Sequence, residues 1–202
     1  TKILMITEKL IFKIPYEIAP PAFAYLLDDV TGATSGYSVC RKLRTAYSGN
    51  AIRVRRSSDN AEQDFGFVAS ALDTASILTF VGGGNGFVTT WYDQSGNSYN
   101  QTQSNATQQP KIIDSGSIVL SNSLPALKFD GSDDFLVNMA LGSFFAGTNV
   151  ACSIVGLYDF SVTQSSTPIS MAKIATSTGL EQLIFNGIDT SNYYSYNIFY
   201  SA

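Results

Sequence analysis

The chain contains no histidine, and it has only two cysteines and four glutamates in 202 residues. The absence of histidine excludes Ser-His-Asp and Cys-His catalysis, HExxH metalloprotease sites and most catalytic zinc chemistry. An enzyme built from this chain would have to use carboxylates, as glycosidases and lyases do. The glutamates available for that purpose are Glu8, Glu17, Glu62 and Glu181.

Charge, cysteine and long apolar runs are also scarce. Charged residues make up 14% of the chain, against an average of about 25%, and the abundant Gly, Tyr and Phe suit an all-β fold. The net charge of −4 argues against general nucleic-acid binding. Cys40 and Cys152 are too few for a disulfide framework, so we expect free thiols. No segment has the roughly eighteen consecutive apolar residues that a membrane span requires.

The first 24 residues differ from the rest in composition. Residues 3–14 are apolar but broken by Thr7, Glu8 and Lys9, which makes a poor secretory signal. Three prolines, at positions 15, 20 and 21, then favour extended backbone. We therefore predict an N-terminal arm with a proline hinge over residues 1–24 and one domain over 25–202. The arm is either a first strand of that domain or a segment that docks on a neighbouring subunit.

Two short helices are predicted in the N-terminal half. In residues 37–47, Cys40, Leu43 and Tyr47 have the spacing of a buried helical stripe. A second helix is predicted over residues 72–81, capped by Ser70 or Asp73 and ended by the glycines at 82–84. These glycines follow a helix and precede a strand, so GGGNG is a turn and not a phosphate loop.

The remainder has the pattern of short strands separated by Gly, Asn, Ser and Asp turns, which predicts a two-sheet sandwich. The predicted strands cover residues 51–55, 87–92, 111–113, 117–120, 126–129, 150–160, 169–174, 180–185 and 193–200. The last of these is still a strand pattern where the sequence ends. A sandwich that lacked its final strands would expose an edge, so we expect either a fragment of a longer protein or partner chains that supply the missing strands.

One motif resembles a known family. Residues 51–67 (AIRVRRSSDNAEQDFGF) and 87–103 (FVTTWYDQSGNSYNQTQ) resemble the opening of the catalytic domain of α-L-arabinofuranosidase B, most closely at WYDQSGN, residues 91–97. The same block looks like one found in phage tail-fibre and capsid-decoration proteins. There a segment like PALKFDGSDDFL, residues 125–136, is typical of concanavalin A-like, lectin-like β-sandwiches. The resemblance implies a mainly β, concanavalin A-like antiparallel sandwich.

The resemblance brings no catalytic residue with it. It covers roughly residues 35–110, whereas the family's carboxylate pair and adjacent-cysteine element lie further along its domain. This sequence has no Cys-Cys doublet, and Glu181 lies in no matching context. We therefore predict no catalytic residues and no cofactor, because fold similarity does not carry function without the site.

Candidate ligand contacts come from aromatic and arginine side chains. All five arginines, Arg41, Arg44, Arg53, Arg55 and Arg56, lie within sixteen residues. They form either a patch for an anionic ligand or structural pairs with Asp59, Glu62, Asp64 or Asp93, and we favour the pairs. The residues proposed to bind a ligand are Trp91, Tyr92, Arg53 and Arg55, with Tyr99 as a further stacking candidate. Asp130, Asp133 and Asp134 are weak candidates for a calcium site, and a solvated turn explains them better.

These observations favour a non-catalytic structural or adhesive protein of a phage virion: a head fibre, decoration protein or tail fibre. Its expected partners are other virion subunits, through the arm or the C-terminal edge, and surface polysaccharide. The alternatives are an arabinofuranosidase-like glycosidase whose catalytic half lies outside this sequence, and a secreted carbohydrate-binding module.

Overall fold

The computed structural model describes residues 25–30, 32–138 and 140, and the strands at 169–174, 180–188 and 194–198. These residues are mainly β, with antiparallel pairing throughout and only short helices. The predicted fold class is confirmed, and the antiparallel sheets are consistent with a β-sandwich. No helix in the described part of the chain has the length and hydropathy to cross a membrane.

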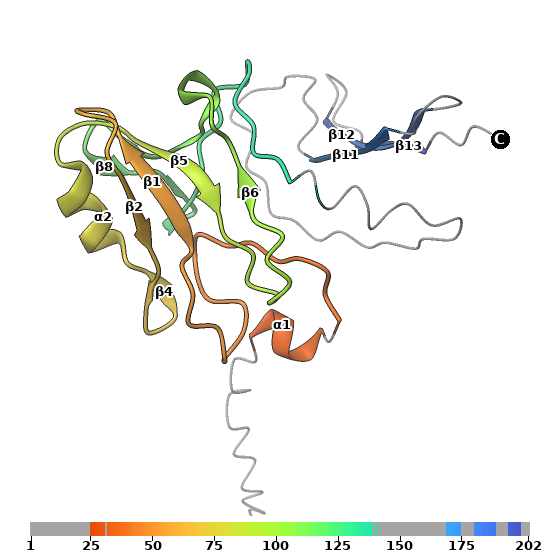
Figure 1. Cartoon of the computed structure of the whole chain (residues 1–202), viewed down its shortest axis with the longest axis horizontal. Helices are drawn as coiled ribbons and strands as arrows, with labels where there is room; N and C mark the ends of the chain where they lie inside the picture. The colour runs from red at the N-terminus through yellow and green to blue at the C-terminus, as the bar shows by residue number, and fades with distance from the viewer. Residues whose placement is uncertain are drawn as a thin grey trace, which may run out of the picture.

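The largest sheet has six strands in the order β2-β1-β5-β7-β8, with β6 pairing to β5 (Figure 1). Its strands are β1 (Ile52–Arg56), β2 (Glu62–Phe65), β5 (Gly86–Trp91), β6 (Gln101–Thr102), β7 (Lys111–Asp114) and β8 (Ser117–Ile118). Two small hairpins accompany it: β3 (Phe67–Val68) with β4 (Ala71–Leu72), and β9 (Leu120–Ser121) with β10 (Leu124–Pro125). The helical elements are α1 (Leu26–Asp29), α2 (Thr74–Val81) and the 3-10 turn η1 (Ala106–Gln108).

The core lies between this sheet and α2. Ile52, Val54 and Val88 are fully buried on β1 and β5, and Ile77 is fully buried on the helix. Alternation along a strand sends neighbouring residues to opposite faces. Gln63 therefore lies on the helix side, together with its register partner Val54, whereas Arg53 and its partner Asp64 lie on the other side. That second face carries polar side chains.

Helix α2 begins at Thr74, two residues later than predicted, because Leu72 belongs to β4, whereas its end at Val81 is as predicted and Asp73 is its cap. The Asp73 carboxylate accepts a hydrogen bond from the Ser76 N–H at 3.1 Å, which caps the helix. Gly82 ends it at φ +68°, ψ −143°, a conformation that suits glycine. GGGNG is thus the connection between α2 and β5, as predicted.

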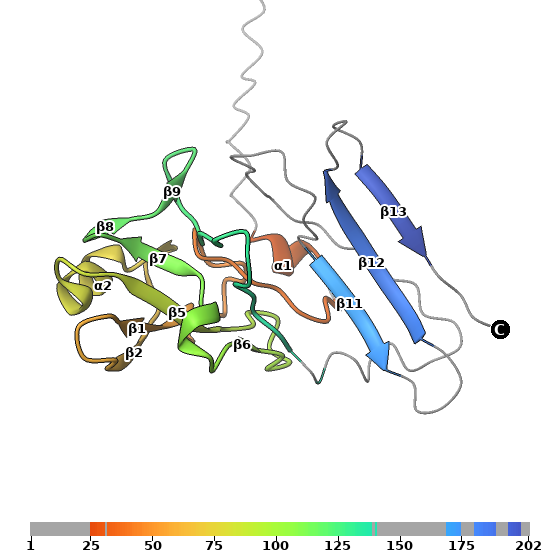
Figure 2. The same ribbon diagram turned by 90° about the horizontal axis from the view of Figure 1, so that it is seen from above.

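A second, three-stranded antiparallel sheet is formed by β11 (Ile169–Ile174), β12 (Leu180–Ile188) and β13 (Tyr194–Ile198), in that order. It is drawn in blue beside the six-stranded sheet in Figure 2. Its register pairs Met171 with Leu183 and Leu183 with Ile198, so apolar positions coincide across its strands. The strands predicted over 169–174, 180–185 and 193–200 correspond to these three.

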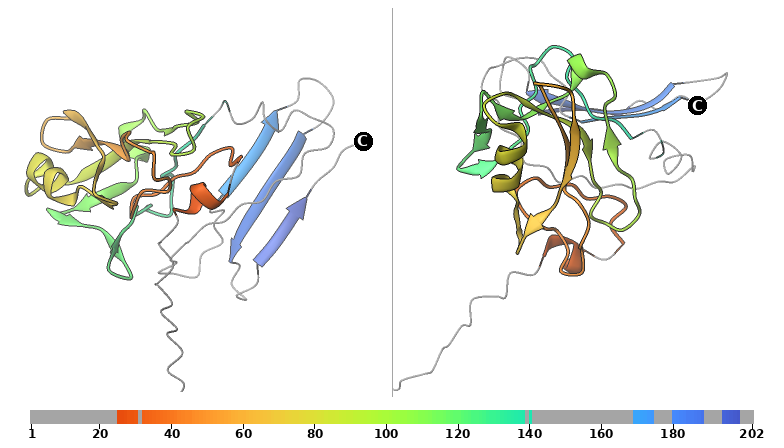
Figure 3. Two further views of the ribbon diagram at one scale, coloured as in Figure 1. Left: turned by 90° about the horizontal axis from the view of Figure 1, so that it is seen from below. Right: turned by 60° about the vertical axis from the view of Figure 1, so that its left-hand side comes forward.

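The helix predicted over residues 37–47 is wrong. This segment is irregular, and Figure 3 shows it as an open loop between α1 and β1. Its backbone groups bond to distant partners: the Lys42 N–H donates to the Ser70 carbonyl and the Leu43 N–H to the Gln94 side chain, both at 2.8 Å. Because these groups have tertiary partners, the helical hydrogen bonds are not formed.

The strand predicted over residues 126–129 is reduced to a single bridge, in which Lys128 pairs with Lys111. Several other predictions lie outside the described residues, namely the arm at 1–24, the strand at 150–160 and Cys152. Cys40 is a free thiol, and its Sγ donates to the Pro125 carbonyl at 3.1 Å. Burial raises the pKa of this thiol.

Candidate functional site: the Asp93 turn and the polar face of the sheet

The turn after β5 is organised by one buried carboxylate. Asp93 is 4% exposed. Its oxygens accept the backbone N–H groups of Gly36 and Ser95, both at 2.8 Å, and of Tyr99 at 3.1 Å, together with the Ser95 hydroxyl at 2.7 Å. A buried charge is tolerated when several donors surround it. Asp93 therefore joins three separate points of the backbone.

The next residues of the motif hold the loop at 33–43. Gln94, fully buried, accepts the Leu43 N–H and donates to the Ser38 carbonyl at 3.2 Å, and its own N–H donates to the Gly36 carbonyl. The Asn97 amide donates to the carbonyls of Ala33 and Thr34. The hydrogen bonds of the WYDQSGN motif thus hold the irregular segment at 33–43 against the end of strand β5. The residue composition predicted a turn here, but the sequence did not predict that the turn would bond to residues 33–43.

Two of the clustered arginines pair with carboxylates, as the sequence predicted. Arg53 donates two hydrogen bonds to Asp64, from Nε at 2.9 Å and from Nη2 at 3.2 Å. Arg56 binds Asp59 through Nε at 2.8 Å and Nη2 at 2.7 Å. The Arg56 guanidinium holds the pKa of Asp59 well below its usual range, and the Asp64 carboxylate raises the pKa of Arg53. Asp93, by contrast, accepts backbone N–H groups and the Ser95 hydroxyl, and the described residues give it no bond to an arginine.

Arg55 is structural for another reason. It is 8% exposed and has three uncharged acceptors: the side chains of Gln109 at 2.8 Å and Asn60 at 2.7 Å, and the Ala106 carbonyl at 3.1 Å. Its guanidinium also lies 4.6 Å from the ring centroid of Phe87. Burial lowers the pKa of this arginine. Arg55 fastens β1 to the turn that contains η1, and little of it is accessible to a ligand.

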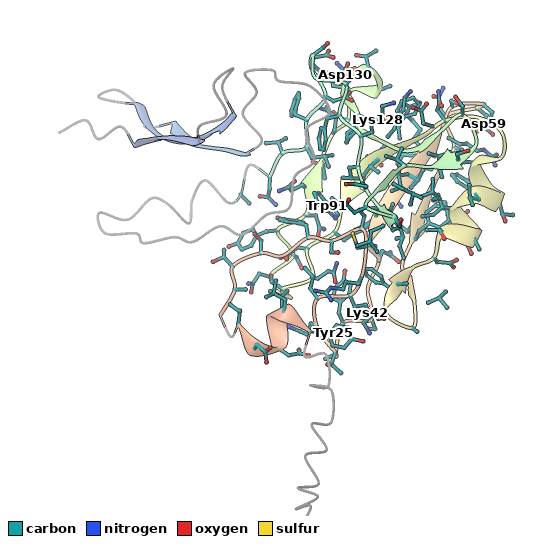
Figure 4. All side chains as sticks on the ribbon, turned by 180° about the vertical axis from the view of Figure 1, so that it is seen from behind. Tyr25, Lys42, Asp59, Trp91, Lys128 and Asp130 are labelled. Carbon is teal, nitrogen blue, oxygen red and sulfur yellow. The ribbon has the colours of Figure 1, made fainter. Side chains whose placement is uncertain are left out.

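The aromatic candidates have different environments. Trp91 packs against the core and the ring of Tyr37, with centroids 5.5 Å apart, and its Nε1 is buried without a partner among the described residues. Figure 4 shows Trp91 in the middle of the described unit. Tyr92 donates its hydroxyl to Asp64 at 2.7 Å, and burial followed by this bond raises its pKa to about 12. Tyr99 accepts the Tyr37 hydroxyl at its carbonyl.

The structure therefore brings two of the four ligand-binding candidates together. Arg53 and Tyr92 share Asp64, a link that no local pattern indicated. Arg55 and Trp91 contribute to packing. A role in ligand binding stays a prediction for all four.

The acidic turn at 130–134 closes on itself. The Asp130 carboxylate accepts the N–H groups of Ser132, Asp133 and Asp134, the first at 2.8 Å, which lowers the pKa of Asp130. Ligand oxygens of Asp130, Asp133 and Asp134 lie within 4.8 Å of one another. The turn is exposed at the edge of the unit in Figure 4, and backbone amides already satisfy its central carboxylate. A self-contained turn explains this arrangement.

On the face of the sheet that packs against α2, a shallow groove of about 380 Å³ runs between β2 and α2. It is lined by Gln63, Ala75, Ser76, Thr79 and Phe80. The Ser76 hydroxyl donates to Asp73, and the Thr79 hydroxyl donates to the Ala75 carbonyl. The hydroxyl donors of Ser76 and Thr79 are thus used within the helix and its cap.

The described residues form a mainly β unit, and part of that unit matches a known family. Residues 27–125, just under half of the chain, match the family model described as "Alpha-L-arabinofuranosidase B, catalytic". The matched range begins in α1 and ends with β10, so it contains the whole six-stranded sheet and the Asp93 turn.

Two solved structures were also found to be similar. One is an arabinofuranosidase complexed with arabinofuranosyl-α-1,2-xylobiose, and the other a GH54 α-L-arabinofuranosidase soaked with a cyclic sulfate inhibitor. Each is 28% identical, covers 35% of this chain and 15% of its own, and has a TM-score of 0.33. The chain thus spans a small part of the length of these enzymes. No curated protein matches significantly.

These comparisons correct one prediction. We expected a chain that is not an enzyme, because no catalytic carboxylate pair was recognisable. That prediction is contradicted, since the matching family model describes a catalytic domain. The prediction rested on the lack of a recognisable carboxylate pair, and such a lack does not exclude a catalytic domain.

Proposed function

We propose that this chain supplies the opening, scaffold-forming part of an arabinofuranosidase-type glycoside hydrolase. The observation that carries the proposal is the family match over residues 27–125. The geometry also supports the proposal. Asp93 and Gln94 belong to the WYDQSGN motif, which most resembles the family, and both are buried and make several hydrogen bonds to distant parts of the backbone. A motif that fixes backbone geometry in this way is what a shared scaffold requires.

The reaction needs two carboxyl groups, about 5–5.5 Å apart in a retaining enzyme and further apart in an inverting one. Glu62 and Asp64 approach each other through Arg53, with Arg53 Nε 4.0 Å from a Glu62 oxygen and 2.9 Å from an Asp64 oxygen. Both carboxylates thus face one arginine, whereas a catalytic pair must flank the bond that breaks. In the proposed function the acid and the nucleophile therefore come from outside the matched range.

The test is hydrolysis of 4-nitrophenyl α-L-arabinofuranoside by the complete protein that carries this chain. We expect release of 4-nitrophenol with an acidic pH optimum, and little release from the matched control 4-nitrophenyl β-D-xylopyranoside. If the complete protein releases no 4-nitrophenol above the buffer blank between pH 4 and 8, the proposal is wrong.

The virion role expected from the sequence gains no support from the family model or the solved structures, which favour the glycosidase reading. The predicted partners and the virion location likewise have no observation behind them.

A further inference from the structure

The face of the sheet opposite α2 carries a group of partly exposed polar side chains that have no role in the proposed catalysis. We call it the Asp64 cluster: Arg53 from β1, Glu62 and Asp64 from β2, and Tyr92 just after β5. Asp64 is its centre, because it accepts two hydrogen bonds from Arg53 and one from Tyr92. β2 is the outermost strand of the sheet, so the cluster lies at an edge.

The cluster is accessible. The side chains of Arg53 and Glu62 are 43% and 41% exposed, and that of Asp64 is 31% exposed. A group with a purely structural role, such as Arg55 on the same strand, is buried. Arg53 and Arg55 are two residues apart on the same face of β1, but the side chain of Arg53 is exposed and that of Arg55 is buried.

The cluster also has unused hydrogen-bonding capacity. Among the described residues, the contacts of Glu62 are long, at 3.4 Å to the Thr89 hydroxyl and 4.0 Å to Arg53 Nε. A carboxylate has about four acceptor positions, and a guanidinium has five N–H donors, of which Asp64 takes two. Acceptors on Glu62 and donors on Arg53 therefore lie side by side, with Tyr92 beside them.

We propose that the Asp64 cluster binds a neutral glycan chain, separately from the site of bond cleavage. Adjacent donors and acceptors match the vicinal hydroxyls of a sugar, each of which both donates and accepts. The formal charge of the cluster, two carboxylates and one guanidinium, is negative, which disfavours acidic polysaccharides. The proposal takes its substrate class from the proposed function, because arabinofuranosidases act on sugars, but its geometry is independent of it.

The probe is soluble wheat arabinoxylan, a neutral polysaccharide, in affinity electrophoresis of the 202-residue chain. We expect the polysaccharide to retard the chain, and polygalacturonate, an acidic polysaccharide, to have no such effect. Glu62→Gln should weaken binding about five- to tenfold, since one hydrogen bond to a charged group is weakened. Its melting temperature should not change, because Glu62 has no short contact to lose.

The matched control is Gln63→Ala, on the same strand but on the helix side, which should bind like the unmodified chain. Tyr92→Phe offers a second variant, expected to weaken binding while retaining the ring. Absence of retardation by arabinoxylan, stronger retardation by polygalacturonate, or equal binding by Glu62→Gln and the unmodified chain would each overturn the proposal.

The two proposals fail separately. The aryl arabinofuranoside used to test hydrolysis has no polysaccharide chain to occupy the cluster, so its cleavage reports on the proposed function alone. Retention by arabinoxylan without hydrolysis would contradict the proposed function and leave the glycan site in place. Hydrolysis without retention by arabinoxylan would support the proposed function and contradict the glycan site.

Discussion

At the scale of single residues, the polar side chains that matter most are those with buried partners. Asp93 and Asp130 have similar roles, since each carboxylate accepts N–H groups from its own turn. They differ in burial, because Asp93 is 4% exposed and Asp130 lies on the surface. Water can replace the partners of an exposed carboxylate but not those of a buried one.

Asp93→Asn should therefore lower the free energy of unfolding by about 3 kcal/mol, because a neutral amide places an NH₂ group among four donors. Urea denaturation of the chain measures this change. Asp130→Asn is the matched control, and we expect a much smaller loss, because water can replace the partners of this exposed carboxylate. Equal losses in the two variants would show that burial of the Asp93 turn does not determine its strength.

Arg55 and Arg53 provide a second comparison. Arg55→Ala leaves the Gln109 and Asn60 side chains without their donor and removes the contact with Phe87. We expect a loss of about 3 kcal/mol of stability, because the buried Gln109 acceptor is left without its donor and the packing on Phe87 is lost. Arg53→Ala, at a half-exposed pair, should cost about 1 kcal/mol or less. Thermal melts followed by circular dichroism distinguish these outcomes, and a smaller effect for Arg55 than for Arg53 would contradict the assignment.

At the scale of elements, local signals predicted α2 but not the segment at 37–47. The ends of α2 are set by Asp73 and Gly82, which act within a few residues of the helix, so the sequence contains the whole cause. The apolar spacing in 37–47 was equally helical. However, Leu43 bonds to Gln94, fifty-one residues away, and Ser38 accepts the N–H groups of Cys40 and Arg41. Neither the tertiary partner of Leu43 nor the local bonds to the Ser38 hydroxyl can be inferred from apolar periodicity.

The same reasoning explains the candidate site. Pairing of arginines with nearby carboxylates was predictable from composition, and Arg53 with Asp64 confirms it. The link from Asp64 to Tyr92 depends on the register of β2, β1 and β5. That register includes a bulge between Arg53 and Val54, which alternation alone does not reveal.

The C-terminal glycine of α2 gives a prediction at this scale. Gly82→Ala should destabilise the chain by about 1–3 kcal/mol, because alanine is strained at positive φ with ψ near −143°. No atom lies within 4 Å of the added Cβ, so the loss would come from backbone strain and not from a clash. Gly83→Ala is the matched control, since its Cβ also meets open space and its φ lies outside the left-handed range. Chemical denaturation of both variants provides the measurement, and equal stabilities would exclude strain at Gly82.

At the scale of the whole molecule, the absence of histidine determines how stability depends on pH. Histidine is the side chain that ordinarily titrates between about pH 5 and 8, and the chain has none. Several carboxylates have lowered pKa values in the folded state. Hydrogen bonds from Ser76 lower that of Asp73, those from Lys128 and Lys111 lower that of Asp114, and the Ser132 N–H lowers that of Asp130.

A carboxylate whose pKa is lowered by folding stabilises the fold above its unfolded value and loses that contribution as pH falls through the folded one. Asp134 has the opposite effect on the pH dependence of stability, since burial raises its pKa. It is one carboxyl group, whereas several others have lowered pKa values. At the alkaline end, Tyr37 and Tyr92 have pKa values raised to about 12, chiefly by burial. Their contribution is complete below the unfolded value of about 10 and is lost as pH rises towards the folded value.

We therefore expect a melting temperature that is nearly constant from about pH 5 to 8, falls below about pH 4 and falls again above about pH 10. Differential scanning calorimetry across this range is the measurement. Asp114→Asn should reduce the loss of stability on the acid side, because it removes one of the titrating groups together with its bonds to Lys111 and Lys128. Tyr92→Phe should likewise reduce the loss on the alkaline side. A change in melting temperature centred between pH 6 and 7 would contradict this account, since none of the described groups with shifted pKa values titrates in that range.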